Sequence, residues 1–458
     1  MLDLVIYGGK LVIPKQGVFA GDVGIQDGKI VAITKPQNGL SAKSKINADG
    51  LHVFPGVIEP HSHITIGAGM KDWETETKAA AMGGVCTNFV FLRGPEPYDS
   101  LFKQMKENGE SKSVGDFSFH IVLIIDEHLS AVKKYVMEWG ITSFKFYMTY
   151  RGEDAKMLGS DGVFHEVKGI DDGFMYDCFR EIAKYPQALI ICHAEDIEIV
   201  RRERNKFIAA GRDDMEAWQA SRPPIAEIEA VRRALLFAET AGCRLNILHL
   251  SSASALEAAK AARLHYDKIL VEVCHPYLTC HSDEGVEQVR KFRPPLRSRA
   301  DVEALWNGLK DGSVNTVGSD HVPRKAQAKM GTVWSQATGG PGTPVLFPVL
   351  LGEGHHKRGI PLDRIAELAS YNPAKIYGLY PRKGDIRLGT DADFTLVDLQ
   401  QVKTIQGKDF EMFGDHFACD GLQVKGWPVL TMVRGKTIMK EGKIVGDSGW
   451  GRFLPRLG

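Results

Sequence analysis

Apolar and polar positions divide the chain into two ends of short β-type runs and a long middle of alternating elements. Residues 5–33 contain β-rich runs joined by Gly-Gly and Asp-Gly turns, and residues 393–397 and 432–445 repeat this pattern. Neither end has enough strands to bury an apolar face alone, so we expect the two to build one small β-sandwich together. This domain is predicted to comprise residues 1–53 and 381–458.

Between the two ends, short apolar runs typical of buried strands alternate with longer segments of helical spacing. The eight runs are 53–58, 85–91, 119–125, 142–147, 189–192, 245–248, 269–273 and 314–317. Eight β/α units within residues 54–380 predict an α/β fold, a (β/α)8 TIM barrel. A doubly wound open sheet is the alternative, but no G-x-G-x-x-G or Walker-type phosphate loop follows an early strand.

Composition and charge narrow the class of protein without naming an activity. The 57 Lys and Arg residues balance 57 Asp and Glu residues, so no net field favours nucleic acid or an acidic membrane surface as a partner. No apolar run approaches the roughly 18 residues of a membrane span, and the N-terminus lacks the pattern of a secretory signal. We therefore expect a cytoplasmic protein. Its scattered cysteines indicate reduced, buried thiols, with a catalytic cysteine as an alternative.

Polar side chains follow several of the strand-like runs, where the carboxyl ends of barrel strands form the functional rim. His61 and His63 are two residues apart on an extended stretch, so their side chains point to the same side and both imidazoles can bind one metal ion. The candidates at four later strands are Lys145, His193, His249 and Asp320. Each histidine alone is more often a satisfied hydrogen-bonding group, but the joint pattern indicates a catalytic metal centre rather than a closed structural zinc site.

Lys145 is the unusual member of this set, because an ammonium group cannot ligate a metal. A buried lysine beside cations would have to be neutral or chemically altered. By residue type alone, we expect a structural lysine that pairs with a carboxylate.

Together these motifs resemble those of the cyclic-amide hydrolases of the amidohydrolase superfamily, which comprise hydantoinases, dihydropyrimidinases, allantoinases and dihydroorotases. The resemblance covers essentially the full length of the chain. The family motif P-G-x-x-D-x-H-x-H lies at residues 55–63, with Glu59 at the usual Asp. The motifs Ser-Phe-Lys, His-Ala-Glu, His-Leu-Ser-Ser and Gly-Ser-Asp-His follow at residues 143–145, 193–195, 249–252 and 318–321.

The resemblance implies two divalent metal ions per chain, bridged by an N6-carboxylated Lys145. Zinc is the first choice, with manganese, cobalt or iron as alternatives. By the same resemblance, one ion is held by His61, His63 and Asp320, and the other by His193 and His249. A metal-bridging hydroxide would open the ring, while Asp320 moves the proton and Tyr150 donates to the carbonyl oxygen as it becomes negative. Family analogy also implies a homotetramer.

The expected substrate is a small cyclic amide or imide, but three positions depart from the family pattern. Thr65 stands where dihydroorotases carry a carboxylate-binding arginine, so dihydroorotase activity is disfavoured. Arg293 precedes Pro294-Pro295, where serine is usual, and Thr338 begins a glycine-rich loop, where Asn-Gly is usual. We predict that Arg293 and Thr338 contact the substrate, with a solvated loop arginine as the alternative for Arg293. The alternative functions are allantoinase-like ureide hydrolysis and a metal-free, non-catalytic scaffold.

Two further segments have open interpretations. Residues 151–163 hold several glycines and are expected to form either a lid that shapes the cavity or a mobile surface loop. Residues 201–206 are basic but interleaved with acid, so a solvated helix face is favoured over a nucleic-acid patch.

Overall fold

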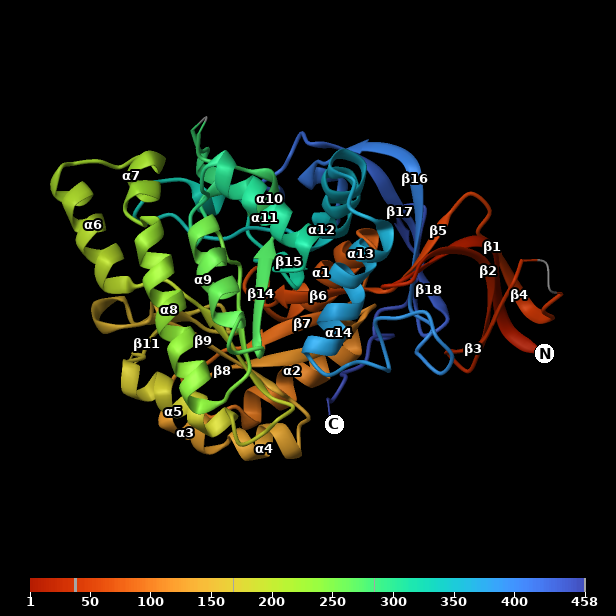
Figure 1. The fold of residues 1–458 in the computed structure, drawn as a ribbon, viewed down its shortest axis with the longest axis horizontal. Coiled ribbons are helices and arrows are strands. Elements are labelled where there is room, and N and C mark those ends of the chain that lie inside the picture. The colour runs from red at the N-terminus through yellow and green to blue at the C-terminus, as the bar shows by residue number, and fades with distance from the viewer. Residues whose placement is uncertain (37–38, 168, 284, 457–458) are drawn as a thin grey trace.

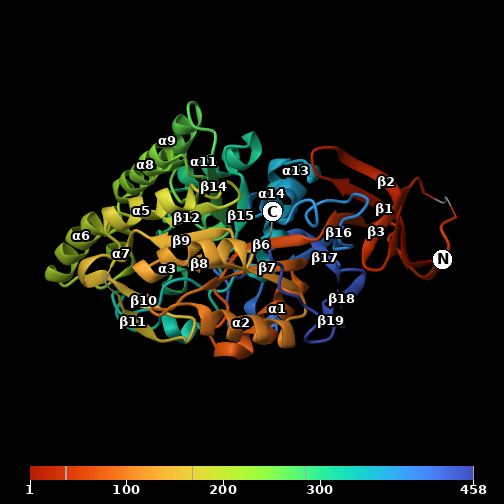
Figure 2. The ribbon, with the colours of Figure 1, turned by 90° about the horizontal axis from the view of Figure 1, so that it is seen from below.

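The computed structural model describes residues 1–36, 39–167, 169–283 and 285–456. A barrel ringed by helices lies beside a curled β-sheet that carries the N-terminus (Figure 1). The perpendicular view separates the same two parts (Figure 2). Residues 457 and 458, the end of the predicted terminal domain, lie outside the described residues.

Eight parallel strands form the wall of the barrel within the described ranges. They are β6 (Val57–Ser62), β7 (Val85–Leu92), β8 (Asp116–Val122), β9 (Ser143–Tyr147), β12 (Leu189–His193), β13 (Leu245–Ile247), β14 (Ile269–Cys274) and β15 (Thr316–Gly318). The ring is closed by a parallel bridge between Ser62 and His321, and the amide of His63 donates to the carbonyl oxygen of His321 over 2.7 Å. The predicted (β/α)8 barrel is confirmed.

Helices cover the outside of the barrel (Figure 1). They are α1 (Asp72–Met82), α2 (Asp99–Lys112), α3 (Asp126–Ser130), α4 (Val132–Met137), α5 (Asp172–Ile182), α6 (Ile197–Ala209), α7 (Met215–Ala220), α8 (Pro224–Ala241), α9 (Ala253–Arg263), α10 (Pro276–Thr279), α11 (Arg299–Asp311), α12 (Thr343–Val349), α13 (Leu362–Ala366) and α14 (Asn372–Ile376). Two π-helical stretches, η5 (Leu350–Lys357) and η6 (Glu367–Tyr371), follow α12 and α13. Short 3-10 turns are η1 (Gly69–Lys71), η2 (Gly152–Asp154), η3 (Gln288–Arg290), η4 (Ala326–Lys329) and η7 (Gly407–Asp409).

Helix α11 shows how the sequence sets these boundaries. Ser298 caps its first turn in a reciprocal pair with Asp301, so two otherwise unpaired backbone amides gain acceptors. Gly312 ends the helix with φ of +91°, a left-handed conformation that a side chain would strain. Such defined ends keep the loops between helix and strand short, and the strand ends carry the candidate site residues.

The two ends of the chain form a single sheet in the order β19-β18-β17-β16-β5-β1-β2-β3, with β4 paired to β1. Its strands are β1 (Leu2–Ile13), β2 (Gly17–Gln26), β3 (Lys29–Thr34), β4 (Ala42–Asn47), β5 (His52–Pro55), β16 (Phe394–Thr404), β17 (Gln423–Val433), β18 (Lys436–Lys440) and β19 (Lys443–Ile444). Antiparallel pairing of β5 with β16 sets Val53 opposite Leu396 and so joins the two termini. The prediction of one β-domain built from both ends is confirmed.

The predicted strand at residues 53–58 is wrong in one respect, because it is two strands. β5 belongs to the terminal sheet and β6 begins the barrel. The break is at Gly56, whose amide donates to the carbonyl oxygen of Asp393 over 2.8 Å. A side chain there would place its Cβ 2.7 Å from the Cys86 sulfur, so only glycine lets the chain pass so closely between the two parts.

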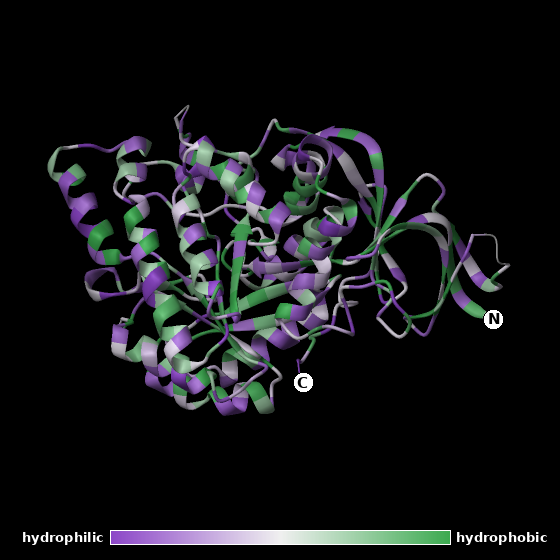
Figure 3. Cartoon of the chain, viewed as in Figure 1, coloured by the Kyte–Doolittle hydropathy of each residue, from purple (hydrophilic) through white to green (hydrophobic). Residues whose placement is uncertain are grey.

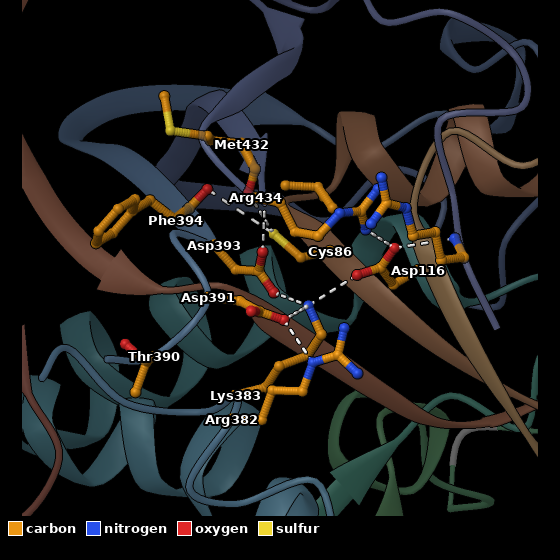
Figure 4. A network of polar contacts seen from close by, with 12 residues as sticks. Cys86, Asp116, Arg382, Lys383, Thr390, Asp391, Asp393, Phe394, Met432 and Arg434 are labelled. Atoms are coloured by element: carbon orange, nitrogen blue, oxygen red, sulfur yellow. Dashed lines mark hydrogen bonds and ion pairs between the residues drawn. The ribbon is translucent and has the colours of Figure 1, made fainter. Parts of the chain in front are cut away.

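A buried ion network joins the terminal sheet to the amino end of β8 (Figure 4). The Lys383 amine lies 2.8 Å from an oxygen of Asp116 and 3.2 Å from one of Asp391, and it also contacts Asp393. Arg434, just after β17, binds Asp116 from the other side. Three carboxylates and two cations are therefore in contact at this junction, which we call the junction network.

The apolar core follows the same division. One large buried cluster fills the barrel and the space under its helices, and a second lies within the terminal sheet. Figure 3 shows mainly hydrophobic barrel strands and helices of mixed character outside them. All seven cysteines are buried and unpaired, as predicted. Burial raises the pKa of Cys192, beside the site, to about 12, which disfavours a thiolate nucleophile. Within the described ranges, no helix combines the length and apolar character needed to cross a bilayer.

Candidate active site

The carboxyl ends of the barrel strands surround a cavity of about 740 Å³, counting its open mouth. This volume is in the range of small-molecule sites. Eight of the predicted site residues line it: His63, Lys145, Tyr150, His193, His249, Arg293, Asp320 and Thr338. His61 lies against this set, fully buried, with its Nε2 atom 3.1 Å from Asp320 Oδ1. The structure thus brings together all nine residues that the sequence singled out.

Asp320 joins the two histidines of the first motif. Its Oδ1 atom lies 3.1 Å from His61 Nε2 and 3.0 Å from His63 Nε2. Barrel closure between Ser62 and His321 brings these segments together although they are far apart in sequence. Asp320 has φ of +50°, a conformation that costs a non-glycine residue about 1 kcal/mol or more and is typical of functional positions.

His193 and His249 form a second pair of imidazoles in direct contact. His193 Nδ1 lies 3.0 Å from His249 Nε2, and both side chains are buried. His193 is the last residue of β12, whereas His249 follows β13 with φ of +35°. The His249 ring centre is 5.5 Å from that of His61, so the two histidine pairs belong to one cluster.

Lys145 lies between these pairs, on β9. Its Nζ atom is 3.2 Å from His61 Nε2 and lies over the rings of Phe91 and Tyr147 at 4.4 and 4.3 Å. No carboxylate in the described part of the chain lies within ion-pair distance of this amine, so the expected pairing with a carboxylate is absent. Burial lowers the pKa of Lys145 to about 8, which increases the neutral fraction of the amine.

Carboxylates behind the imidazoles orient their ring nitrogens. Glu272 Oε1 lies 2.6 Å from His61 Nδ1, and Glu195 Oε2 lies 2.8 Å from His193 Nε2. Burial opposes ionisation of Glu195, but the charges of Arg222 and His193 lower its pKa to about 2. A ring N–H donated to each carboxylate leaves the opposite nitrogen with its lone pair facing the cluster, as in metal sites.

The donor set fits divalent metal ions. Ligand atoms of His61, His249 and Asp320 all lie within 4.8 Å of one another. Among the described residues, the buried Nδ1 atoms of His63 and His249 have no hydrogen-bond partner. Imidazole nitrogens and a carboxylate oxygen are ligands that zinc, manganese, cobalt and iron accept.

The segment after Tyr150 forms part of the cavity wall. Strands β10 (Lys156–Leu158) and β11 (Phe164–Glu166) pair as a hairpin, and Leu158 and Phe164 line the cavity. Tyr150 stacks on Tyr147 with ring centres 4.6 Å apart. Of the two interpretations offered for residues 151–163, the structure favours an element that shapes the cavity.

The basic run at residues 201–206 is only partly a solvated face, so that prediction is wrong for two of its members. Arg201 Nε lies 2.8 Å from Asp154, and Arg204 Nη1 lies 2.6 Å from the other oxygen of the same carboxylate. Both arginine side chains are about one-fifth exposed. They attach α6 to the loop after Tyr150, because that loop carries the acidic partner.

Sequence reasoning missed four residues of this region. Those in the cavity wall are Arg93, Tyr147 and Arg324, and Glu272 lies behind His61. Arg93 directly follows β7, so the rule that barrel strand ends carry function could have found it. Glu272 is the one charged residue of the β14 sequence Ile-Leu-Val-Glu-Val-Cys, and a charge in a buried strand was a usable signal.

Comparison with known proteins gives a consistent relationship. Residues 147–438 match the model of the amidohydrolase family. The chain is 31% identical to the L-hydantoinase of Paenarthrobacter aurescens, covering 100% of this chain and 98% of the relative. It is 34% identical to the allantoinase of Solibacter usitatus, covering 100% and 98%. The solved structure of the L-hydantoinase (dihydropyrimidinase) from Arthrobacter aurescens superposes with a TM-score of 0.91 at 29% identity, covering 100% of both chains.

The matched family model begins at residue 147, so His61, His63 and Lys145 precede it. The full-length relatives cover these positions as well. Dependence on divalent metal is general in this family, in agreement with the clustered donor atoms. On the family model, the relatives and the shared fold, the chain belongs to the amidohydrolase family.

Proposed function

We propose that this protein is a dinuclear metal-dependent hydrolase that opens a cyclic amide, imide or ureide ring. The observation that carries the proposal is the convergence of candidate metal ligands from five barrel strands on one cavity. Similarity to hydantoinases and an allantoinase supports a ring amide as the bond cleaved.

The two metal positions follow the two histidine groups. The proposed ligands of one ion are His61, His63 and Asp320, and those of the other are His193 and His249. When bound, the ions supply an activated water at neutral pH and polarise the scissile carbonyl. Zinc is the proposed metal, and manganese, cobalt or iron would suit the same donors.

Lys145 is proposed to carry an N6-carboxylate that bridges the two metal positions. The buried amine has no carboxylate partner in the described ranges, and burial lowers its pKa to about 8. The neutral amine can add its lone pair to the carbon of carbon dioxide and lose one proton. This step gives the cluster a second anionic oxygen ligand beside Asp320 and accounts for a lysine at its centre.

Asp320 and Tyr150 are the proposed groups that act on the substrate. Asp320 is partly exposed to the cavity, so it can accept a proton from water and deliver it to the leaving ring nitrogen. Tyr150 borders the same cavity, and burial raises the pKa of its phenol, so the hydroxyl keeps its proton for donation. Water thereby cleaves the ring C–N bond: its oxygen joins the carbonyl carbon, the C–N bond breaks, and the nitrogen gains a proton.

Arg293 and Thr338 are the proposed substrate contacts from outer loops. Both line the cavity, and Arg293 is exposed there with its guanidinium 5.5 Å from the Trp218 ring. The amide of Gly339, next to Thr338, donates to Lys291 O over 3.0 Å, which fixes that loop against the segment that carries Arg293. A ring held between these loops would lie in the same cavity as the proposed metal ligands.

Two further proposals concern the state of the protein in the cell. We propose a cytoplasmic location and a homotetramer, on the resemblance to the family. Light scattering on the purified protein should give four times the mass of one chain, whereas the mass of a single chain would contradict the tetramer.

A metal analysis joined to a substrate panel tests the proposed function. Protein expressed with added zinc should hold about two equivalents per chain and hydrolyse at least one of hydantoin, dihydrouracil, allantoin or succinimide. Allantoin alone as a substrate would favour the allantoinase-like alternative. Absence of bound metal, together with no hydrolysis after metal addition, would favour the scaffold alternative.

A further inference from the structure

Three arginines border the proposed reaction cavity, and each comes from a different loop. Arg93 follows β7, Arg293 lies in the segment between α10 and α11, and Arg324 follows β15. One carboxylate, Asp320, belongs to the described cavity wall, and it is already engaged by His61 and His63. The cavity wall therefore carries an excess of positive charge that the catalytic roles assigned above leave unexplained.

Arg93 differs from three other buried arginines in that it lines the cavity, whereas theirs are engaged by protein groups outside it. Arg222 contacts both oxygens of Glu195 at 3.3 Å, Arg297 donates to Arg222 O over 2.6 Å, and Arg456 donates to Ser143 Oγ over 2.8 Å. Arg93 is only 5% exposed and lines the cavity, yet within the described ranges no carboxylate lies at ion-pair distance from it. Its Nε atom has no hydrogen-bond partner, as is also true of the Nε atoms of Arg222 and Arg456. A mostly buried guanidinium that faces a cavity without a carboxylate partner is costly, so a bound anion would stabilise it.

The backbone of Arg93 is held in place, and its guanidinium lies beside the Tyr147 hydroxyl at the cavity wall. Its amide donates to Ser160 Oγ over 3.1 Å, and its carbonyl oxygen accepts from the Ser160 amide over 2.8 Å. Ser160 in turn accepts from the hydroxyl of Thr65 over 2.6 Å. Position 65 therefore supports the loop next to Arg93. This arrangement fixes the cation before a ligand arrives, which reduces the entropy lost on binding.

Arg324 adds a second cation to the same cavity wall, and no carboxylate among the described residues pairs with it. Burial and the charge of Arg93 lower the pKa of Arg324 to about 10. Its buried Nε atom also has no hydrogen-bond partner among the described residues. Two neighbouring guanidinium groups repel each other, and a carboxylate between them would remove the repulsion and accept their paired N–H groups.

We propose, on the basis of the proposed function, that the substrate is a cyclic amide with a carboxylate on its ring or on a short side chain. Arg93 and Arg324 bind this carboxylate. Arg293, at the exposed mouth, attracts the anion as it enters. The absence of an arginine at position 65 therefore does not rule out a carboxylated ring, because Arg93 supplies the guanidinium from the neighbouring strand end.

Matched substrate pairs test this inference on the metal-loaded enzyme. Each pair differs only in the anion: hydantoin-5-acetate against hydantoin-5-acetamide, and dihydroorotate against dihydrouracil. We expect kcat/KM to favour the anionic member of at least one pair by about 10-fold or more, and the favoured pair reports where the carboxylate is carried. Arg93→Gln should lower kcat/KM for the favoured anionic member by about 100-fold, mainly through KM, and leave its neutral partner within about 3-fold.

Two variants guard against a folding defect. Arg324→Gln, at a partly exposed position, should reduce the anionic preference in the same direction. Arg180→Gln, on the exposed face of α5, is the matched control and should change neither member. Calorimetry supplies a readout independent of turnover: orotate should bind wild-type protein more tightly than uracil, and Arg93→Gln should abolish the difference.

Equal kcat/KM within both pairs would overturn the inference. An equal loss of kcat/KM for both members of a pair in Arg93→Gln would also overturn it, because Arg93 would then serve the metal centre. A carboxylate preference that survives in both arginine variants would overturn it as well, because the metal ions would then bind the anion. Failure of the proposed function is distinguishable. In that case no ring is opened by metal-loaded protein, while the binding of orotate against uracil still tests the arginines.

Discussion

Two fully buried lysines on the same barrel have opposite surroundings. Lys383 joins the junction network at the amino end of β8, where it contacts Asp116, Asp391 and Asp393. Lys145 lies at the other rim, against His61 and aromatic rings, and has no carboxylate partner in the described ranges. These contacts raise the pKa of Lys383, although burial opposes the rise, whereas burial lowers that of Lys145 to about 8.

The difference shows why clustering of acidic groups alone does not identify a metal site. Asp116, Asp391 and Asp393 place oxygens within 4.8 Å of one another, as the ligand atoms of His61, His249 and Asp320 do. The three aspartates of the junction network already enclose an ammonium group, which lies where a metal ion would have to bind. At the other rim, the ligand atoms of His61, His249 and Asp320 lie beside Lys145, an amine that loses its charge more easily than Lys383 does. In TIM barrels the amino-end rim serves stability and the carboxyl-end rim serves catalysis.

Removal of Lys145 should have the largest effect on function. We expect Lys145→Ala to lose bound metal and to lower kcat by more than about 10³-fold, because metal ions contribute several kcal/mol of transition-state stabilisation. A short carboxylate such as propionate should restore part of both, since it can replace the proposed bridging carboxylate. Metal analysis and kcat, each with and without propionate, check this. Full metal content in the variant would contradict the bridging role.

Removal of Lys383 should give the opposite result. Lys383→Met leaves Asp116, Asp391 and Asp393 buried with too little positive charge, so we expect the free energy of unfolding to fall by about 3 kcal/mol or more. Metal content and kcat of the folded fraction should stay at the wild-type level. Urea unfolding followed by circular dichroism measures the first effect. Loss of metal without loss of stability would show that the two rims are not separate in function.

Neutralising the carboxylate behind His61 should have a smaller effect. Glu272→Gln keeps an acceptor oxygen but removes the charge that holds the His61 N–H, so we expect metal affinity to fall by about 10- to 100-fold. Metal retained after dialysis against graded chelator measures this, and Glu257→Gln on the exposed face of α9 is the matched control. Equal retention of metal in Glu272→Gln and Glu257→Gln would mean that Glu272 does not orient the His61 ring.

The rim with the candidate metal ligands was predictable because strand assignment and motif spacing are local. The pattern around His61, Lys145 and Asp320 lies at strand ends that an apolar run identifies, and barrel geometry then brings those ends together. The same rule would have found Arg93 if it had been applied to the end of β7. The hairpin after Tyr150 carried no periodicity strong enough to separate a cavity wall from a free loop.

The junction network was not predictable from the sequence. Asp116, Lys383 and Arg434 stand in segments separated by up to 318 residues, and no local period links one to another. Their partnership arises only when the terminal sheet packs against the barrel. The break at Gly56 has the same origin, because the close approach of Cys86 is a tertiary contact that makes two strands of one apolar run.

The smallest expected effect concerns the response of the junction network to acid. Burial alone would raise the pKa of Asp391, but the charges of Lys383, Arg382 and Lys29 lower it to about 2. A carboxyl whose pKa is lower in the folded state stabilises the protein above its unfolded value near 4, and this contribution is lost as the pH falls toward 2. Asp391→Asn should therefore cost about 2 kcal/mol at pH 6, and the difference from wild type should vanish near pH 2.

Urea titrations of wild type and Asp391→Asn between pH 6 and pH 2.5 would measure this convergence. Asp393 acts in the opposite sense, because burial raises its pKa, so stability linked to Asp393 is present in acid and lost at higher pH. Subtracting the two unfolding curves isolates the contribution of Asp391 and of groups coupled to it, since every other carboxyl is common to both proteins. A difference that stays constant with pH would mean that Asp391 has the same pKa folded and unfolded. Lys383 would then be neutralised by Asp116 and Asp393 alone.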